Sequence, residues 1–306
     1  MPRAVTALGI DLGGTKIEAQ LFDADWSVID RKRVPTPGGY AALQTALIDL
    51  VGWGDARAGH ALPVGIGAAG AINPRNGQVL AANLAADGHP LPSDLGTALR
   101  RPVTYLNDSH ALALSEAVFG AGRPYDTLFA LVLGTGVGGG FVRAGALCAG
   151  ASGTGGEVGH IAAPAHLVQR HGLPVLVCPC GRTGCIETLI SGAGLTRIAA
   201  SLTGATLTAP QIIAARSSDP QMQAVWQVWC ALTADLIQTV TLTLDPDCVV
   251  LGGGMSDIAG LVQDLAAAVA QAQFAGFSSP AILRAAGGAV SGARGAAYAA
   301  WQVANA

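Results

Sequence analysis

Residues 8–22 read LGIDLGGTKIEAQLF: an apolar run, a turn with two glycines, and a second largely apolar run. We predict a buried strand over residues 5–10 and a partner strand over residues 16–22, joined by the turn DLGGT. The same pattern returns at residues 128–142, which read LFALVLGTGVGGGFV. Two similar supersecondary units in one chain predict two related α/β halves that face a cleft.

Hydrophobic periodicity and turn residues predict the other elements and the domains. We place the domain boundary near residues 120–124 and expect the final helix to return to the first domain. The first domain then comprises residues 1–120 and about 294–306, and the second comprises residues 121–293. The other predicted strands span residues 28–34, 64–68, 103–106, 128–133, 139–142 and 248–251, and the predicted helices span residues 40–53, 109–119, 187–202, 221–242, 257–272 and 293–303.

The composition excludes several classes of protein. Of the 306 residues, 51% are hydrophobic and 12% are charged, and the net charge is −3. A chain this apolar can build a large core, and it lacks the basic excess that a nucleic-acid backbone or a membrane surface requires. No signal-peptide core precedes Asp11, and no run of about 18 residues has the apolar bulk of a transmembrane helix. We therefore expect a cytoplasmic protein that acts on small molecules.

The turn from Asp11 to Lys16 has the composition of a phosphate-binding site. The backbone N–H groups of Gly13 and Gly14 are open to an anion, the Thr15 hydroxyl is a further donor, and Lys16 adds positive charge. Asp11, at the end of the strand, can hold a hydrated magnesium ion. The alternative is a simple hairpin turn, and the spacing of a Walker A loop is absent.

The second turn has five glycines in the seven residues 134–140. A structural hairpin needs one or two, so we predict a second phosphate-binding loop here. A third glycine cluster lies between a predicted strand and a predicted helix, where Gly253 and Gly254 either contact a nucleotide or form a tight turn. The residues of the second loop are Gly134, Thr135, Gly136, Val137, Gly138, Gly139 and Gly140.

Asn107 and Asp108 follow a predicted strand, at the end where α/β folds place their ligands. A carboxylate in this position can orient and deprotonate a hydroxyl group. The alternative is structural: either Asp108 or Ser109 caps the helix that follows.

One histidine and three cysteines form the metal-binding pattern of the chain. His160 lies in GEVGH, and Cys178, Cys180 and Cys185 lie in CPCGRTGC. Four such ligands fill a tetrahedral zinc site, which makes the metal structural. The alternative is three buried cysteines without a metal. Two acidic residues flank the set and can bind sugar hydroxyls or be ordinary surface groups: Glu157 and Glu187.

Together these motifs resemble the ROK family, a group of bacterial sugar kinases and related repressors. The resemblance covers nearly the whole chain. The matching stretches are LGIDLGGTK (8–16), Asn107-Asp108, LGTGVGGG (133–140), GEVGH (156–160), CPCGRTGCIE (178–187), LGGGM (251–255) and GARGAA (292–297).

The resemblance implies an actin-like, hexokinase-like (ribonuclease H-like) fold with the active site in the cleft between two domains. It implies that ATP phosphorylates a sugar hydroxyl, with Asp108 as general base and Asp11 positioning Mg²⁺. His160 would both bind sugar and ligate zinc, and the chain would form a homodimer. The sugar-binding residues implied are Gly70, Asn83, Asn107, Asp108, Glu157, His160 and Glu187.

Some stretches bear on which sugar is phosphorylated. RVPTP at 33–37, AAN at 81–83, LSEA at 114–117 and GLP at 172–174 resemble the family members that convert N-acetylglucosamine to its 6-phosphate. GCIETLISG at 184–192 is shared with fructokinases, so fructose, like glucose, stays an alternative. Two departures affect this preference: the family usually has proline at the position of Ala69, and it often has asparagine at the position of His110.

Two other classes of protein compete with a kinase. A repressor of this family needs an N-terminal helix-turn-helix, and the first predicted strand begins too early for one. A sugar-binding protein without activity has no need of Asp108, Asp11 and both glycine turns. We therefore expect a kinase whose partners are a sugar and ATP, with no nucleic acid and no membrane.

Overall fold

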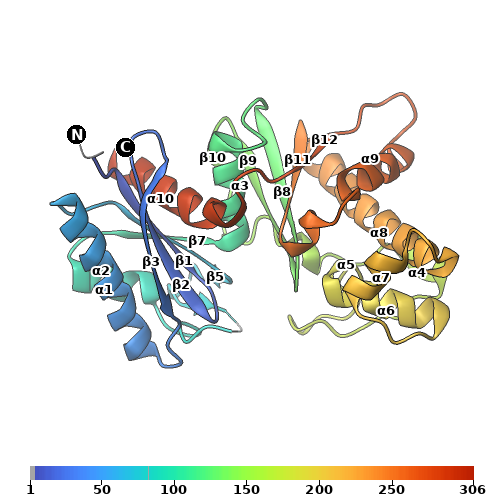
Figure 1. Ribbon diagram of the computed structural model, residues 1–306, viewed down its shortest axis with the longest axis horizontal. Helices are drawn as coiled ribbons and strands as arrows, with labels where there is room; N and C mark the ends of the chain where they lie inside the picture. The colour runs from blue at the N-terminus through green and yellow to red at the C-terminus, as the bar shows by residue number, and fades with distance from the viewer. Residues whose placement is uncertain (1–3, 82) are drawn as a thin grey trace. The chain divides into compact units, whose positions relative to one another are not determined.

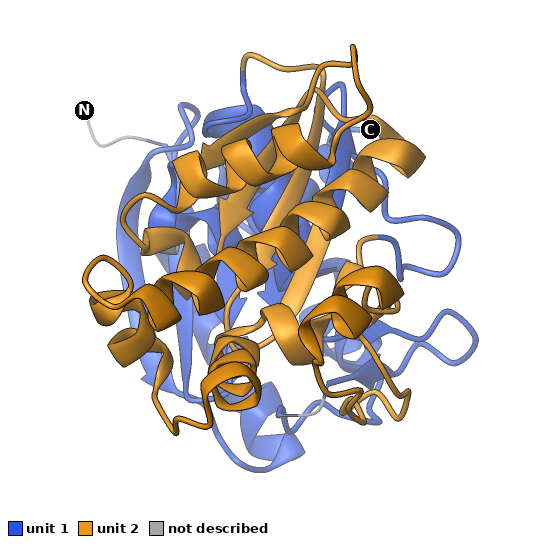
Figure 2. Cartoon of the chain, turned by 90° about the vertical axis from the view of Figure 1, so that its right-hand side faces the viewer, with its two compact units in different colours: residues 1–123, 140–155, 286–306 blue, residues 124–139, 156–285 orange. Residues whose placement is uncertain are grey.

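The computed structural model describes residues 4–81 and 83–306 and divides the chain into two compact units (Figures 1 and 2). Unit 1 comprises residues 1–123, 140–155 and 286–306, and unit 2 comprises residues 124–139 and 156–285. No helix in the described part of the chain is long and apolar enough to cross a membrane.

Unit 1 is built on a five-stranded sheet in the order β3-β2-β1-β4-β7. β1 and β2 form the predicted antiparallel hairpin, whereas β1, β4 and β7 are parallel. Leu12, Ala68 and Asn107 are in register at the carboxyl ends of these three strands, so the segments after them leave the sheet at one edge. The strands are β1 (Ala7–Leu12), β2 (Lys16–Phe22), β3 (Val28–Pro35), β4 (Val64–Ala68) and β7 (Val103–Asn107).

The two faces of β1 pack against different helices because side chains alternate along a strand. Leu8 and Ile10 belong to the core shared with α1 (Tyr40–Ala58), whereas Ala7 packs against α10 (Ser291–Ala304). Gly9 lies on the α10 face, where a Cβ would be 2.0 Å from the carbonyl oxygen of Ala293. The helix can lie this close to the sheet only because residue 9 has no side chain.

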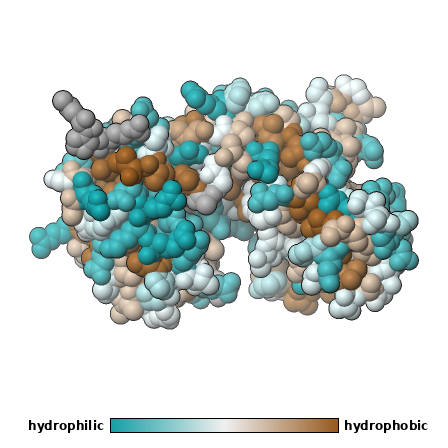
Figure 3. Space-filling model, in the orientation of Figure 1, coloured by the Kyte–Doolittle hydropathy of each residue, from teal (hydrophilic) through white to brown (hydrophobic). Residues whose placement is uncertain are grey.

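The edge strand β3 exposes Arg31, Lys32 and Arg33. Figure 3 shows a hydrophilic patch over this strand. Positive charge on an exposed edge discourages pairing with another chain. The remaining elements of unit 1 are β5 (Ala71–Ile72), β6 (Val79–Leu80), α2 (Leu91–Leu99), α3 (Asp108–Phe119), β10 (Ala146–Leu147) and the 3₁₀ helix η3 (Gly288–Val290).

The second sheet repeats this plan in the order β10-β9-β8-β11-β12. β8 (Thr127–Leu133), β11 (Cys248–Gly252) and β12 (Ala281–Arg284) are parallel. β9 (Val137–Arg143) contains the last four residues of the glycine-rich stretch 134–140, so the turn itself is confined to residues 134–136 and is shorter than the predicted loop. The helical elements of unit 2 are η1 (Val158–His160), α4 (Ala165–His171), α5 (Glu187–Ile190), α6 (Gly192–Thr203), α7 (Ala209–Ala215), α8 (Pro220–Leu244), η2 (Gly254–Asp257) and α9 (Leu261–Ala272).

Most of the predicted elements exist, but some details were wrong. The helix predicted over residues 257–272 begins at Leu261, because Gly260 has a left-handed backbone conformation and the 3₁₀ helix η2 ends before it. The helix predicted over residues 187–202 is two helices, because Ser191 is extended and its hydroxyl accepts a hydrogen bond from the Gly194 N–H. The helix predicted from Ser109 begins at Asp108, and its N-cap is Asn107. α2, α4, α7 and β12 were not predicted.

Candidate active site

Asn107 and Asp108 lie at the carboxyl edge of the unit 1 sheet. The Asn107 side chain accepts a hydrogen bond from the Ser109 N–H (2.9 Å) and donates one to the Gly70 carbonyl (3.1 Å). Oδ1 of Asp108 also accepts from the Ser109 N–H (2.7 Å), and the residue is exposed. Asn107 therefore caps α3 and holds Gly67-Ala-Ala-Gly70, the end of β4 and the bend after it, which we call the 67–70 loop. The Asp108 carboxylate is oriented and accessible.

Asp11 at the end of β1 interacts electrostatically with Asp108. Burial raises the pKa of Asp11, the carboxylates of Asp108 and Glu18 raise it further, and Lys16 lowers it. Two carboxylates at one sheet edge repel each other, and a cation relieves that repulsion. The pair therefore has the chemistry of a site for a hard cation such as Mg²⁺.

The first glycine turn is held by a threonine that the sequence did not single out. Thr36 donates its hydroxyl to the Gly13 carbonyl (2.6 Å) and its N–H to the Thr15 carbonyl (3.1 Å). The N–H of Gly13 is itself used inside the turn, on the Lys16 carbonyl (3.1 Å). The exposed residues Gly14, Thr15 and Lys16 are therefore better placed than Gly13 to bind an anion. Thr36 could have been found from the sequence, because it lies in the stretch RVPTP at 33–37, which was noted only for its bearing on the sugar.

Two side chains of β7 hold the 67–70 loop. Asn107 binds the Gly70 carbonyl, and the Tyr105 hydroxyl donates to the Ala69 carbonyl (3.3 Å). Burial, and then the charge of Asp108, raise the pKa of Tyr105, so its hydroxyl keeps the proton that it donates. Gly70 has φ +98°, and a Cβ there would lie 2.2 Å from the Leu80 carbonyl oxygen.

Asn83 lies next to the first glycine turn. A Cβ on Gly14 would be 3.4 Å from the Asn83 carbonyl oxygen, and Asn83 is exposed. Unit 1 therefore brings together the predicted residues Asp11, Gly13, Gly14, Thr15, Lys16, Gly70, Asn83, Asn107 and Asp108.

In unit 2, Glu187 binds the second glycine turn. Its Oε2 accepts a hydrogen bond from the Val137 N–H (2.8 Å), and a Cβ on Gly136 would lie 2.9 Å from the same oxygen. The turn is closed by Gly192, whose N–H donates to the Gly134 carbonyl (2.9 Å). Gly136 therefore allows the close approach of a carboxylate, and Glu187 is a contact of this turn as well as a candidate sugar ligand.

The third glycine motif lies beside the second one. Gly253 has φ +78°, and a Cβ there would be 2.4 Å from the carbonyl oxygen of Leu133, the residue before the second turn. A side chain at residue 253 is therefore excluded by the backbone of β8. Gly254, its neighbour, is exposed.

His160, Cys178, Cys180 and Cys185 form a compact cluster, as predicted. Their ligand atoms all lie within 4.8 Å of one another. The Sγ atoms of Cys180 and Cys185 are 3.6 Å apart, and His160 Nδ1 is 3.6 Å from Cys178 Sγ. Tetrahedral zinc with Zn–S bonds of about 2.3 Å places neighbouring sulfurs about 3.8 Å apart, so the cluster has the dimensions of such a site.

Both predicted glutamates flank this cluster. Glu157 Oε2 is 3.8 Å from His160 Nε2, the nitrogen opposite the sulfurs, and Glu187 Oε1 is 3.6 Å from Cys178 Sγ. A cavity of about 270 Å³ is lined by Glu187 and by Thr135 of the glycine turn, with Arg197 also in its wall. Pro179, between Cys178 and Cys180, also lines this cavity, which therefore lies beside the cluster and is lined by polar groups.

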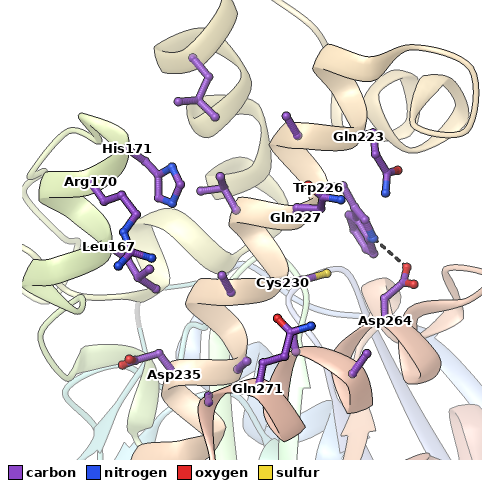
Figure 4. A pocket seen from close by; sticks show the side chains of 18 of the residues that line it. Leu167, Arg170, His171, Gln223, Trp226, Gln227, Cys230, Asp235, Asp264 and Gln271 are labelled. Carbon is purple, nitrogen blue, oxygen red and sulfur yellow. Dashed lines mark hydrogen bonds between the residues drawn. The ribbon is translucent and has the colours of Figure 1, made fainter.

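A larger groove, of about 950 Å³, lies elsewhere in unit 2, between α4, α8 and α9 (Figure 4). In its wall the Trp226 indole N–H donates to Asp264 (2.8 Å) and the ring stacks on Trp229, and both tryptophans are buried in the core. Of the residues that the structure describes, none of the predicted site residues lines this groove.

Two five-stranded sheets with matching strand orders, each with a glycine-rich turn between the first two of its strands along the chain, define an actin-like, hexokinase-like protein. The chain belongs to the ROK family, whose model matches residues 7–303. This confirms the fold class and the family that the sequence predicted.

Several members of this family are similar over their whole length. N-acetylgalactosamine kinase AgaK of Shewanella sp. (strain ANA-3) is 37% identical over 292 residues, which are 94% of each chain. N-acetyl-D-glucosamine kinase of Salmonella paratyphi B is 38% identical over 95% of this chain and 97% of its own. The crystal structure of the ROK hexokinase from Thermus thermophilus has a TM-score of 0.86 and 30% identity, and the match covers 97% of this chain and 98% of that one.

Proposed function

We propose that this chain is an ATP-dependent sugar kinase that converts N-acetylglucosamine to N-acetylglucosamine 6-phosphate. The observation that carries the proposal is the exposed, oriented carboxylate of Asp108 at the sheet edge that also holds the first glycine turn. The reaction class is supported by the two relatives named as sugar kinases above, to which this chain is similar over nearly its whole length.

Asp108 is the proposed general base. Its carboxylate accepts the proton of the sugar hydroxyl as that oxygen attacks the terminal phosphorus of ATP and the bond to the ADP oxygen breaks. Transfer of this kind depends mainly on positioning and on charge stabilisation. The Ser109 N–H holds one oxygen of Asp108 in a fixed direction, which supports this role.

The glycine-rich turns are the proposed ATP site, with Mg²⁺ at Asp11. Exposed backbone at Gly14, the Thr15 hydroxyl and the Lys16 ammonium bind phosphate oxygens. The exposed Gly254 leaves backbone open for the nucleoside, and Gly253, which packs on β8, positions it. Asp11 would hold Mg²⁺, which would neutralise phosphate charge at this site. The second turn contributes Gly134, Thr135, Gly136, Val137, Gly138, Gly139 and Gly140.

The sugar is proposed to bind polar groups whose positions are fixed by the protein. Asn107 and Gly70 are joined by a hydrogen bond, and Glu187 is held by the Val137 N–H. Fixed partners reduce the entropy lost when a ligand binds. The full proposed set is Gly70, Asn83, Asn107, Asp108, Glu157, His160 and Glu187.

Zinc is the proposed ion of the Cys178, Cys180, Cys185 and His160 cluster, and its role there is structural. With all four positions filled by protein atoms, zinc would fix the loop that carries Glu157 and Glu187. His160 Nε2 would stay free for Glu157 or for a sugar oxygen. We further propose a homodimer in the cytoplasm, where ATP is available.

The second candidate acceptor is N-acetylgalactosamine, because the Shewanella relative of nearly the same identity is named for it. The two sugars differ only at the 4-hydroxyl. Fructose and glucose are further candidate acceptors, because the GCIETLISG stretch at 184–192 resembles that of the family's fructokinases.

The test is a measurement of kcat/KM for ATP-dependent phosphorylation of N-acetylglucosamine, N-acetylgalactosamine, N-acetylmannosamine, glucose and fructose. The proposal expects the highest value for N-acetylglucosamine. A higher value for another sugar keeps the kinase and overturns the substrate, and no phosphorylation of any sugar overturns the kinase in favour of a binding protein.

A further inference from the structure

His110 is the one buried histidine among the six, all of which belong to the described part of the chain; 5% of its surface is exposed. It lies in the first turn of α3, two residues after Asp108. Its Nε2 is 2.5 Å from the carbonyl oxygen of Gly155. Because a carbonyl only accepts, Nε2 carries the proton and donates it. The bond joins residues 45 positions apart, so it is a tertiary contact.

Gly155 ends a loop, residues 149–155, that closes on itself. The Gly155 N–H donates to the Ala149 carbonyl (3.2 Å), and a Cβ on Gly155 would be 2.8 Å from that oxygen. Just before the loop, the Cys148 N–H donates to the Phe141 carbonyl of β9 (2.8 Å). The 149–155 loop is therefore attached to β9 at its start and to His110 at its end.

The first turn of α3 also packs directly on β9. A Cβ on Gly140 would lie 2.8 Å from the Ala113 Cβ and 3.1 Å from the Ser109 carbonyl oxygen. The start of α3, β9 and the 149–155 loop thus form one framework inside unit 1. His110 supplies the contact that ties the end of the loop to the helix.

The chain leaves this framework towards a proposed sugar ligand. Gly156 follows with φ +96°, and Glu157 comes next. We infer that His110 is a positioning residue, which fixes Gly155, two residues before Glu157 along the chain, to the helix that begins with Asp108. The inference rests on the proposed function, in which Asp108 is the base and Glu157 binds the sugar.

The test compares three variants. His110→Leu fills the buried position with an apolar side chain and removes the donor, whereas His110→Gln restores an N–H donor the same number of bonds from Cα. Ser115→Ala is the control, because Ser115 is buried on the same helix and accepts a hydrogen bond from Arg294 Nε (2.9 Å) away from the 149–155 loop. Melting temperature, the KM for sugar, the KM for ATP and hydrogen exchange of the amides of residues 153–158 are measured for each.

We expect His110→Leu to raise the KM for sugar about 10-fold, because small misplacements of a binding group cost that much or more, with little change in the KM for ATP. Exchange of the 153–158 amides should accelerate in the same variant. His110→Gln should restore both, and Ser115→Ala should lower the melting temperature and change neither.

An unchanged KM for sugar in His110→Leu, or no recovery in His110→Gln, overturns the inference. Failure of the proposed function is recognised separately, because the wild-type protein would then phosphorylate no sugar. In that case the hydrogen-exchange measurement still decides whether His110 holds the 149–155 loop, because hydrogen exchange can be measured on an inactive protein.

Discussion

The two units hold their candidate site residues by different means. In unit 1 the strand ends Leu12, Ala68 and Asn107 are in register, and the functional residues follow directly from them. In unit 2, Glu157 and Glu187 lie at either end of a segment with isolated bridges such as Ala162–Cys185, next to the Cys₃His cluster. The first arrangement follows from the sheet, whereas the second depends on the Cys₃His cluster, for which we propose a zinc ion.

The largest expected effect is the loss of the proposed base in unit 1. Asp108→Asn keeps the size of the side chain and the contact to the Ser109 N–H but cannot accept a proton. We expect kcat to fall by about 10²–10⁴-fold. Sugar affinity, measured by calorimetry, and melting temperature should change little. Full activity in this variant would contradict the assignment of the base and would leave the sheet edge with a structural role only.

Metal removal should affect unit 2 and spare unit 1. Chelation, or Cys185→Ser, should lower kcat/KM for sugar by about 10–100-fold, since groups that support a site through a metal contribute this much. Hydrogen exchange should accelerate over residues 157–187 and stay unchanged in β7 and α3. Cys148→Ser is the control, because Cys148 is exposed and outside the cluster. If hydrogen exchange accelerates equally in both units, the candidate site residues of unit 1 depend on the metal as much as those of unit 2 do, which contradicts the comparison.

A smaller effect, on the KM for sugar, is expected when Gly70 of unit 1 is replaced. Gly70→Ala places a Cβ 2.2 Å from the Leu80 carbonyl oxygen in a loop held by Asn107 and Tyr105. The KM for sugar should rise several-fold. Gly77→Ala is a matched control, because Gly77 also has positive φ (+72°) but a Cβ there meets nothing within 4 Å. If both variants change KM equally, backbone strain and not the shape of the 67–70 loop is the cause.

The smallest effect, on stability alone, concerns the buried Glu116. Burial by itself would raise the pKa of Glu116, but hydrogen bonds from the N–H groups of Ala286, Ala121 and Gly287 and from the Ser291 hydroxyl together lower it below the ordinary 4.5. A lowered pKa in the folded state stabilises the fold above the unfolded pKa, and this stabilisation is lost as the pH falls through the folded value.

Glu116→Gln should therefore lower the free energy of unfolding by about 1–3 kcal/mol at pH 7, because it leaves buried donors without their acceptor. The difference from the wild type should shrink as the pH falls below 4.5, where the Glu116 carboxylate of the unfolded chain protonates while that of the folded protein, with its lowered pKa, stays charged. Urea unfolding at pH 7 and pH 4 measures it. A difference that does not depend on pH would show that the charge of Glu116 is unimportant.

The sequence predicted the parts of the site that are local in the chain. The two glycine turns and Asn107-Asp108 each lie in one short motif, and the Cys₃His set lies in two. The structure brings the four cluster residues together, and it places Asn107 and Asp108 at the carboxyl end of a strand, as the motifs predicted. The roles of these residues and the domain boundaries near residues 120 and 294 stay predictions.

The contacts that hold the motifs could not be predicted in the same way. Thr36 on Gly13 and His110 on Gly155 join residues 23 and 45 positions apart, and no periodicity encodes such pairs. The helix break at Ser191 was missed because residues 187–202 keep an apolar pattern across it. Short elements such as α2 are set by packing, as shown by its buried Leu91 and Leu95.

The central claim is tested most directly by mixing the wild-type protein with ATP, Mg²⁺ and N-acetylglucosamine and measuring ADP and sugar phosphate in the same sample. The account predicts equal amounts of ADP and N-acetylglucosamine 6-phosphate, and little ADP when the sugar is omitted. ADP release without a phosphorylated sugar, or no ADP with any sugar present, would contradict it.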